Sequence, residues 1–411
     1  MAESNVAKES SVFRNPGSPA LDIFPNVRNS FYNSIDKKTL DKLVVHWENN
    51  IASRMVWVDS DKNPYRMFVA PLAYTVPVVG LAMAAVSSQH ASSPAGYEEL
   101  SRKARDEAID MISAYVKNIT SHVLAGHDVG MQLNEQSVER MLAAMLLLSC
   151  YEMTDSGSSA ADFHRRAARS LVNTFETTRH KRSALFEFLR NQLSIHDVMA
   201  CTTSFQRSTM KDVILPSPKD QSVLFSSFLT YLYDVTLLSS ELPSSRARSV
   251  RLGLSLRHIQ TQFEVARGET LMACGRLMIE PASRRRDFIC VVNIMHYAAM
   301  LYAARCLDLG SPQICSGYLD SLFDQIAAMS VAKDWLHCIA WAVFVAGTEC
   351  HGDGRRQAII AELYDQLCEN MRFRNFHDAM HFLRDFWNGT DADWRWLARD
   401  WESSGHGVLL S

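Results

Sequence analysis

Residues 63–90 read NPYRMFVAPLAYTVPVVGLAMAAVSSQH, and nearly every side chain from Met67 to Val86 is apolar. A run of this length is long enough to cross a lipid bilayer as one helix. Pro71 and Pro77 favour two shorter helices, because proline fits the first turn of a helix and disrupts its interior. No cluster of Lys or Arg adjoins the run to set an orientation in a membrane. The run therefore predicts a pair of buried apolar helices that begin near Pro71 and Pro77.

The composition agrees with a large folded core. The chain has 411 residues, of which 47% are hydrophobic and 21% charged, and its formal net charge is -3. This balance provides no overall cationic field that would bind nucleic acid or an anionic membrane. Nine cysteines are present, none of them before Cys150 and none in CxxC spacing. They are expected to be reduced core thiols in a cytosolic or nuclear protein.

Apolar residues recur at helical spacing through most of the chain. In residues 37–51, for example, Leu40, Leu43, Val44 and Trp47 share one helical face, and Asp36 precedes them as a candidate N-cap. No segment shows the alternation and tight turns of β-hairpins, and no repeat of fixed period is found. The sequence predicts an all-α protein, a large irregular multi-helix array of about 12–16 helices.

Composition also suggests how the chain is divided. Residues 1–35 are rich in Ser, Asn and Pro without a signal-peptide core, which predicts a flexible leader. Residues 36–204 and 250–402 are predicted as the two halves of a helical domain. Residues 205–249 are predicted as a variable helical segment with connections, and residues 403–411 as a tail.

One short motif has the spacing of a metal site. HDAMH, residues 377–381, places His377 and His381 one helical turn apart, as in a zinc pair. Asp378 stands where zinc proteases have glutamate as general base, and only Asp385, Asp391 and Asp393 could complete the ligand set. An amphipathic helix, with Phe376, Met380 and Leu383 inward and the histidines at its margin, explains the motif better.

Other candidate motifs have equally simple explanations. ECHGDG, residues 349–354, offers Cys350, His351 and Asp353 as ligands, but its glycines fit a loop between helices. The basic clusters at 179–182 and 283–286 fit solvated helix ends, with nuclear localisation or nucleic-acid contact as the alternative. Phosphate-binding loops and hydrolase motifs are missing. No catalytic, metal or cofactor site is therefore predicted, and the chain is predicted not to be an enzyme.

The stretch at 63–90 resembles the start of the fungal-specific transcription factor domain, the helical C-terminal portion of fungal zinc binuclear cluster regulators. That family has an Asn-Pro-aromatic-Arg start, a Pro-Leu-Ala step and an apolar helix ending near a His, matched here by 63–66, 71–73 and His90. Further similar stretches follow in the family's order at residues 145–172, 188–203, 295–307, 341–357 and 375–387. The resemblance runs from about 36 to 402, with 205–285 matching weakly.

The resemblance implies a nuclear transcriptional regulator of a filamentous fungus, acting on a metabolic or biosynthetic gene set such as one of secondary metabolism. It implies other transcription factors or co-regulators as partners, no membrane partner, and leaves a small-molecule inducer and a homodimer open. The family's zinc module of six cysteines is not found before Cys150, so zinc and specific DNA contact are assigned to no residue here. DNA contact is expected to be indirect or non-specific. A helical scaffold without a role in transcription and a metal-dependent helical enzyme are the alternatives.

Overall fold

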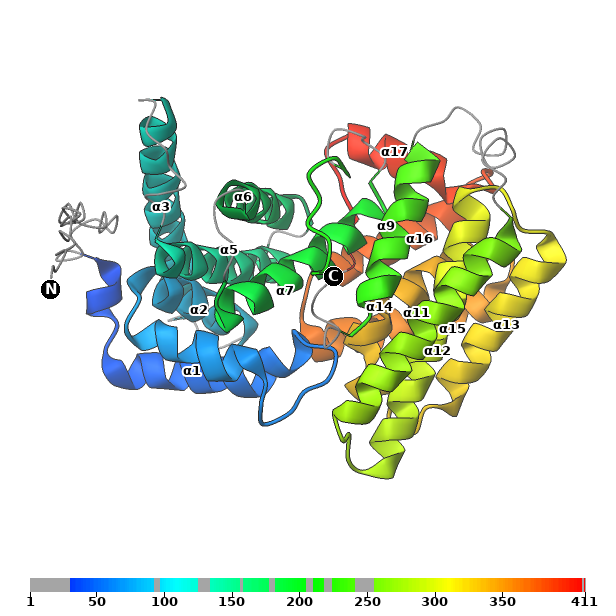
Figure 1. Ribbon diagram of the computed structural model, residues 1–411, viewed down its shortest axis with the longest axis horizontal. Helices are drawn as coiled ribbons and strands as arrows, with labels where there is room; N and C mark the ends of the chain where they lie inside the picture. Colours follow the sequence, from blue (N-terminus) through cyan, green and yellow to red (C-terminus); the bar gives the residue numbers. More distant parts are fainter. Residues whose placement is uncertain are drawn as a thin grey trace, which may run out of the picture.

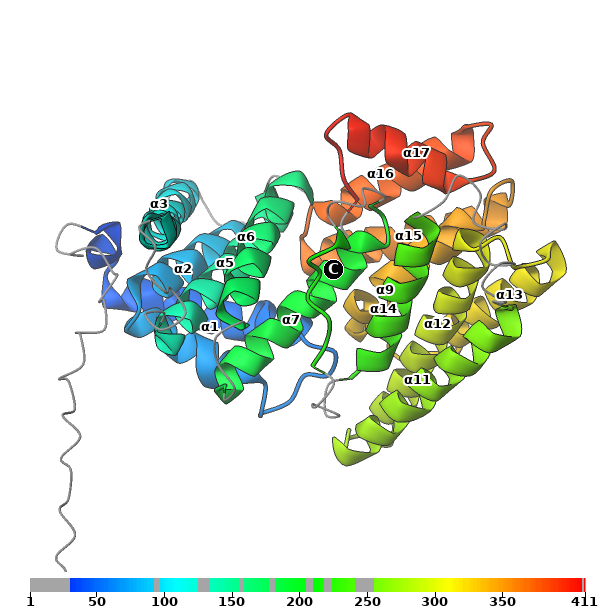
Figure 2. The same ribbon diagram turned by 45° about the horizontal axis from the view of Figure 1, so that its top comes forward.

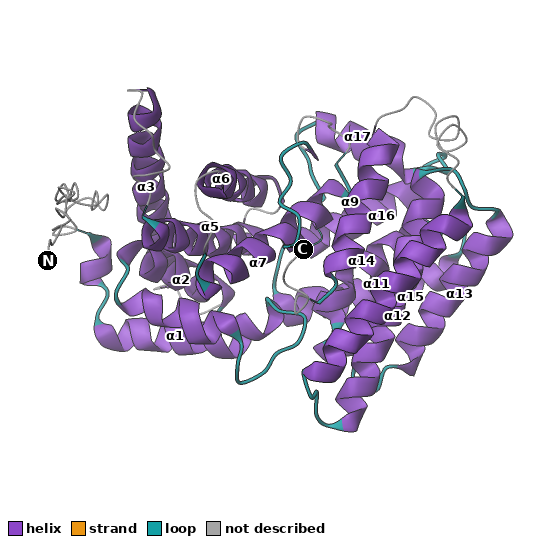
Figure 3. Cartoon of the chain, viewed as in Figure 1, coloured by secondary structure: helices purple, strands orange, loops and turns teal. Residues whose placement is uncertain are grey.

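The computed structural model describes residues 30–91, 97–124, 134–155, 158–176, 182–204, 210–217, 224–240, 255–408 and 410. In these residues the regular structure is helical and contains no strand (Figure 3). The number of helices falls within the range of 12–16, so the all-α prediction is confirmed. Most of the predicted leader, residues 205–209, 218–223 and 241–249 of the predicted connections, and residues 179–181 of the first basic cluster lie outside the described residues.

The first half of the chain is centred on one apolar helix. Its elements are η2 (Phe31–Ser34), α1 (Lys37–Asn50), η3 (Ala52–Arg54), η4 (Tyr65–Val69), η5 (Ala70–Tyr74), α2 (Pro77–His90), α3 (Tyr97–Leu124), α5 (Glu135–Asp155), α6 (Ser158–Glu176) and α7 (Ala184–Cys201). Helix α2 packs against α1, α3 and α5, and α5 packs in turn against α6 and α7. The apolar stretch quoted above therefore forms the centre of this half.

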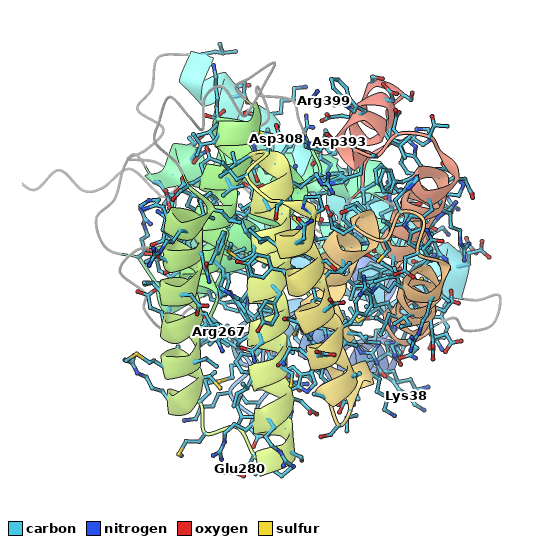
Figure 4. The ribbon with its side chains drawn as sticks, turned by 90° about the vertical axis from the view of Figure 1, so that its right-hand side faces the viewer. Lys38, Arg267, Glu280, Asp308, Asp393 and Arg399 are labelled. Carbon is cyan, nitrogen blue, oxygen red and sulfur yellow. The ribbon has the colours of Figure 1, made fainter. Side chains whose placement is uncertain are left out.

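The second half is centred on α12. Its elements are α9 (Ser226–Ser240), α11 (Leu256–Arg276), α12 (Ala282–Cys306), α13 (Pro312–Ala328), η6 (Ala332–Asp334), α14 (Leu336–Thr348), α15 (Gly354–Met371), α16 (Asn375–Asn388) and α17 (Trp394–Ser403). Helix α12 packs against α9, α11, α13 and α14. Figure 4 shows α11, α12 and α13 side by side, with Glu280 and Asp308 near opposite ends of α12.

The apolar run forms a bent helical pair, as its prolines predict. Pro71 lies in the first turn of η5, and Pro77 is the first residue of α2. The segment Tyr65–Tyr74 and α2 meet at 110°. Residues 78–88 of α2 are all buried, which explains why this helix has no polar face.

Two parts of the described chain are apolar and long enough to cross a membrane, namely α12 and the bent pair counted as one span. In the apolar window of α12, 78% of the residues are buried inside the protein. Packing in the core is therefore a sufficient reason for the composition of both.

Helix α1 has the N-cap and the buried apolar face that its sequence predicts. The Asp36 carboxylate accepts a hydrogen bond from the Thr39 N–H at 3.0 Å, as an N-cap does. The predicted apolar stripe, including Leu43 and Trp47, is buried. Both predictions for this helix are confirmed.

The two halves lie side by side, and the end of the chain returns between them (Figures 1 and 2). Thr203 Oγ1, just after α7, donates a hydrogen bond to the Val408 carbonyl oxygen at 2.5 Å. Val408 and Leu410 are buried. Residues in the segment 403–411 thus take part in the core at the junction of the halves.

Candidate ligand cavity between the two halves

The loop of residues 51–62, between α1 and η4, lies against the second half of the chain. His337 Nε2 is 3.2 Å from the Val56 carbonyl oxygen. The Cys338 thiol donates a hydrogen bond to the Trp57 carbonyl oxygen at 3.4 Å. The rings of Trp57 and Phe225 have centroids 4.4 Å apart. The backbone and one aromatic side chain of this loop therefore connect the two halves.

The Asn-Pro-Tyr-Arg motif fixes the conformation of this loop, here called the junction loop. Asn63 is only 1% exposed, and its side-chain amide donates to the Ala52 carbonyl oxygen at 3.0 Å and to Asp59 Oδ1 at 2.9 Å. Arg66 binds both oxygens of Asp59, at 2.6 and 3.0 Å. Bidentate pairs of this kind define geometry as well as adding stability. The motif thus ties together the two ends of the segment 52–59.

Hydrogen bonds outside the junction loop also join the two halves directly. The Arg374 N–H donates to the Met153 carbonyl oxygen at 2.6 Å, which connects the start of α16 to α5. The Trp341 indole N–H donates to Thr202 Oγ1 at 2.9 Å, which connects α14 to the end of α7. The junction is therefore defined by specific hydrogen bonds as well as by apolar packing.

A mainly apolar cavity of about 80 Å³ lies at this junction. Its wall comes from the junction loop, α5, α7, α14, the segment joining α15 to α16, and Leu410. Four of the lining residues are methionines, Met55, Met153, Met199 and Met371. At roughly 10–15 Å³ for each water, such a space has room for a small organic molecule. Methionine side chains adapt readily to the shape of a bound ligand.

A polar cavity of about 360 Å³ adjoins the apolar one. Arg54, Trp57, His337 and Met371 line both cavities and so form the wall between them. The polar cavity is also lined by Lys333 and Asp334, whose exposure opens it to solvent, together with Arg284 and Asp59. A molecule at the shared wall would touch polar and apolar surroundings at once.

Two hydrogen-bond donors at this wall have no partner among the described residues. They are Arg54 Nη1 and Trp57 Nε1, and both atoms are buried. A buried donor without an acceptor costs about 1–3 kcal/mol of stability. Unsatisfied donors that line a cavity are typical of a site that a ligand or ordered water completes.

The histidines and cysteines that line the apolar cavity are uncharged near neutral pH. Burial lowers the pKa of His196 to about 4 and, by the same cause, the pKa of His337 to about 4. Burial raises the pKa of the Cys150 thiol to about 12 and that of the Cys338 thiol further. Protonated thiols are poor nucleophiles. The arrangement is suited to binding through apolar contacts and the two donors.

Neither of the two HDAMH histidines lines the apolar or the polar cavity. His377 and His381 are both exposed, while Phe376, Met380 and Leu383 are buried, which confirms the packing of an amphipathic helix. Among the described residues, no three His, Cys, Asp or Glu side chains are grouped so that they could hold a metal ion.

The ECHGDG residues have separate structural contacts. The buried Cys350 thiol donates to the Ala346 carbonyl oxygen, and His351 Nε2 lies 3.1 Å from the Gly389 carbonyl oxygen. Asp353 caps α15 by accepting a hydrogen bond from a backbone N–H in its first turn. These contacts belong to the loop between α14 and α15.

The basic clusters make contacts within the protein. Arg182 pairs with Glu176 at 3.0 Å, and Arg285 pairs with Glu280 at 2.6 Å. Arg284 stacks over the Trp335 ring and lines the polar cavity.

Arg54 and Trp57 were not predicted as site residues from the sequence. The available signal was weak: an arginine and a tryptophan in a short segment where the helical pattern of α1 stops, directly before Asn63 and Pro64. Their partners in the cavity wall, such as His337, lie about 280 residues later in the chain.

Comparison with known proteins matches residues 42–411 to the fungal specific transcription factor domain. The match includes all residues named above for the two cavities, and it confirms the resemblance drawn from residues 63–90. No curated protein and no solved structure matches the chain. Because the family match spans most of the chain, the protein belongs to the fungal specific transcription factor domain family.

Proposed function

We propose that this protein is a transcriptional regulator whose helical domain responds to a small molecule bound at the junction of its two halves. Membership of the family supports a role in transcription regulation, and the family is not an enzyme family. The observation that carries the ligand response is the apolar cavity between the halves, with unpaired donors from Arg54 and Trp57 at its wall.

The position of the cavity suggests how binding would be transmitted. A ligand there would touch the junction loop from the first half and α14 from the second. A ligand shifts a conformational equilibrium only by the difference in its affinity for the two states. Because the cavity wall is shared between the halves, any change in their relative position changes its shape and therefore its affinity.

The finer parts of the proposal extend the role that membership of the family supports. The protein acts in the nucleus on a metabolic or biosynthetic gene set, together with other transcription factors or co-regulators. Its contact with specific DNA is made by a zinc-cluster module outside these 411 residues or by a partner protein.

A reporter assay tests this proposal. The chain is fused to an unrelated DNA-binding domain and expressed in a fungal host. Reporter output is then followed on different carbon and nitrogen sources, and with cell extracts of the organism that carries the gene. Met55→Trp fills the cavity from the junction loop, while Met272→Trp makes the same change at a site that is 70% exposed. We expect the response to be lost in Met55→Trp and kept in Met272→Trp, at equal protein levels. An unchanged response in Met55→Trp would contradict the proposal.

The general role has its own test. Deletion of the gene should alter the transcriptome under at least one inducing condition. Exclusion of the tagged full-length protein from the nucleus under all conditions would favour the alternative of a helical scaffold.

A further inference from the structure

We propose that the ligand bound at the apolar cavity between the two halves is a small monocarboxylate with an apolar body. Its carboxylate would accept hydrogen bonds from Arg54 and Trp57, and its body would occupy the apolar cavity. This inference rests on the proposed function, because it names the chemical class of molecule to which the domain would respond.

The unpaired atoms specify acceptors. Arg54 Nη1 and Trp57 Nε1 can each only donate a hydrogen bond. A group that satisfies both must therefore present acceptor oxygens. A carboxylate provides two oxygens in one plane, and its bond to a guanidinium is charge-assisted and stronger than a bond between neutral groups. A primary amide has one oxygen and would bring a donor against these donors.

The charges around the shared wall favour an anion. Arg54, Arg284 and Lys333 line the polar cavity, opposed by Asp59 and Asp334. The Asp59 carboxylate is already bound at both oxygens by an arginine of the Asn-Pro-Tyr-Arg motif. Lys333 and Asp334 are both exposed to solvent, so the interactions of both with the wall are screened, which leaves the charges of Arg54 and Arg284. The wall therefore has a surplus of positive charge.

The apolar cavity favours a single acidic group on a small apolar body. Its volume of about 80 Å³ suits a short alkyl or aryl group. His196 and His337, which line it, are neutral near pH 7 because burial lowers the pKa of each to about 4. A second carboxylate would enter this space without a cation to pair with it, at a large desolvation cost. These facts favour a monocarboxylate over a dicarboxylate or a nucleotide.

Calorimetric titration of the full chain near neutral pH tests the inference. The probes are hexanoate and phenylacetate, each beside its primary amide. We expect at least one acid to bind, and its amide to bind at least about tenfold more weakly, as expected for the loss of a charge-assisted hydrogen bond. Arg54→Gln should weaken binding of the acid by a similar factor, and Trp57→Phe by a smaller one. The matched control is Arg257→Gln on the exposed face of α11, which should bind as wild type does.

A stability measurement separates recognition from folding. Because Arg54 Nη1 has no partner among the described residues, Arg54→Gln should unfold at the same temperature as wild type or slightly higher. With hexanoate present, the wild-type unfolding temperature should rise more than that of the variant.

The remaining outcomes overturn the inference in distinct ways. If the amides bind as tightly as the acids, or if Arg54→Gln binds the acid unchanged, the carboxylate is not recognised here, although the cavity remains a ligand site. If neither acid binds, the inference also fails. The reporter response of Met55→Trp then still decides whether the domain uses the cavity at all.

Discussion

At the scale of single residues, Asn63 is the buried polar group on which the junction loop depends. Its side chain donates to Ala52 and Asp59 and accepts from the Tyr65 N–H at 3.0 Å. Asn63→Ala removes the bonds to Ala52 and Asp59 and leaves the buried Tyr65 N–H without its acceptor, so we expect the free energy of unfolding to fall by about 2–3 kcal/mol. Urea unfolding followed by circular dichroism measures this.

The control for this prediction is Asn388→Ala, at the exposed C-terminal end of α16. It should change the free energy of unfolding by less than about 0.5 kcal/mol. If both variants lose a similar free energy of unfolding, the hydrogen bonds of Asn63 in the loop add no stability beyond that of an exposed asparagine.

Three histidines whose pKa is lowered by burial give a second prediction, for how the free energy of unfolding depends on pH. Burial lowers the pKa of His90, His196 and His337 to about 4, and for His90 the neighbouring His46 contributes next. In the unfolded chain these groups have a pKa near 6.5. Between about pH 6.5 and 4 the unfolded state binds protons that the folded state does not, so stability falls as the pH falls through this range. Each histidine contributes at most on the order of 3 kcal/mol to this loss.

Removing one of these groups should reduce the effect. We expect His90→Gln to lose less stability between pH 7 and pH 5 than wild type does, measured by urea unfolding at each pH. His258→Gln, at an exposed position, is the control and should follow wild type. The attribution to buried imidazoles is wrong if His90→Gln shows the wild-type slope.

Whether the role of a residue could be predicted depends on how far along the chain its partners lie. Asp36 was identified as a cap because its partner lies three residues away. Asn63 and Arg66 were singled out only by resemblance, since their role depends on a loop whose conformation no local pattern encodes. Arg54 gave only a weak signal, because a single arginine after a helix is ordinarily a solvated side chain.

At the scale of elements, the bend between η5 and α2 requires a residue without a side chain at position 80. A Cβ on Gly80 would lie 2.4 Å from Tyr32 Cε2 and 2.5 Å from the Ala73 carbonyl oxygen. The carbonyl belongs to the backbone of η5, so the two elements would have to separate. We expect Gly80→Ala to lower the free energy of unfolding by about 1–3 kcal/mol or more.

Gly268 in α11 is the matched control for this change. A Cβ there would meet no atom within 4 Å. Gly268→Ala should therefore raise stability by about 0.4–1 kcal/mol, because alanine restricts the unfolded chain more than glycine does. Thermal unfolding of both variants tests these two predictions. If Gly80→Ala is as stable as wild type, η5 and α2 can move apart at the bend without loss of stability.

The elements themselves were the most predictable level of the structure. Helical periodicity and prolines located α1, α2 and α16 from sequence, because the pattern of apolar residues along an amphipathic or wholly buried helix reflects which of its faces are buried. The junction loop has no period, and its course depends on the second half of the chain. Periodicity therefore could not reveal that residues 54–57 line a cavity.

At the scale of the whole molecule, the cavity exists only because distant segments meet. Its wall combines the junction loop, α14, the start of α16 and Leu410. Two halves of one helical domain were predicted from composition and periodicity, but the packing between them has no signal in a single sequence. The resemblance gave the family and left an inducer open, whereas the position of a site for one had to come from the structure.

The last prediction concerns duplex DNA. The chain of 411 residues should bind no DNA sequence specifically by itself, because specific binding needs an element placed in a groove and enough cations to neutralise phosphates. Its net charge is -3. Arg182 and Arg285 from its two basic clusters are paired with glutamates, and Arg284 stacks on Trp335. Only weak, salt-sensitive and sequence-indifferent binding is expected. A mobility-shift titration of the purified chain at physiological salt checks this, with scrambled duplex as competitor. Nanomolar binding to one promoter that the scrambled duplex fails to displace would require a DNA-reading element within these residues.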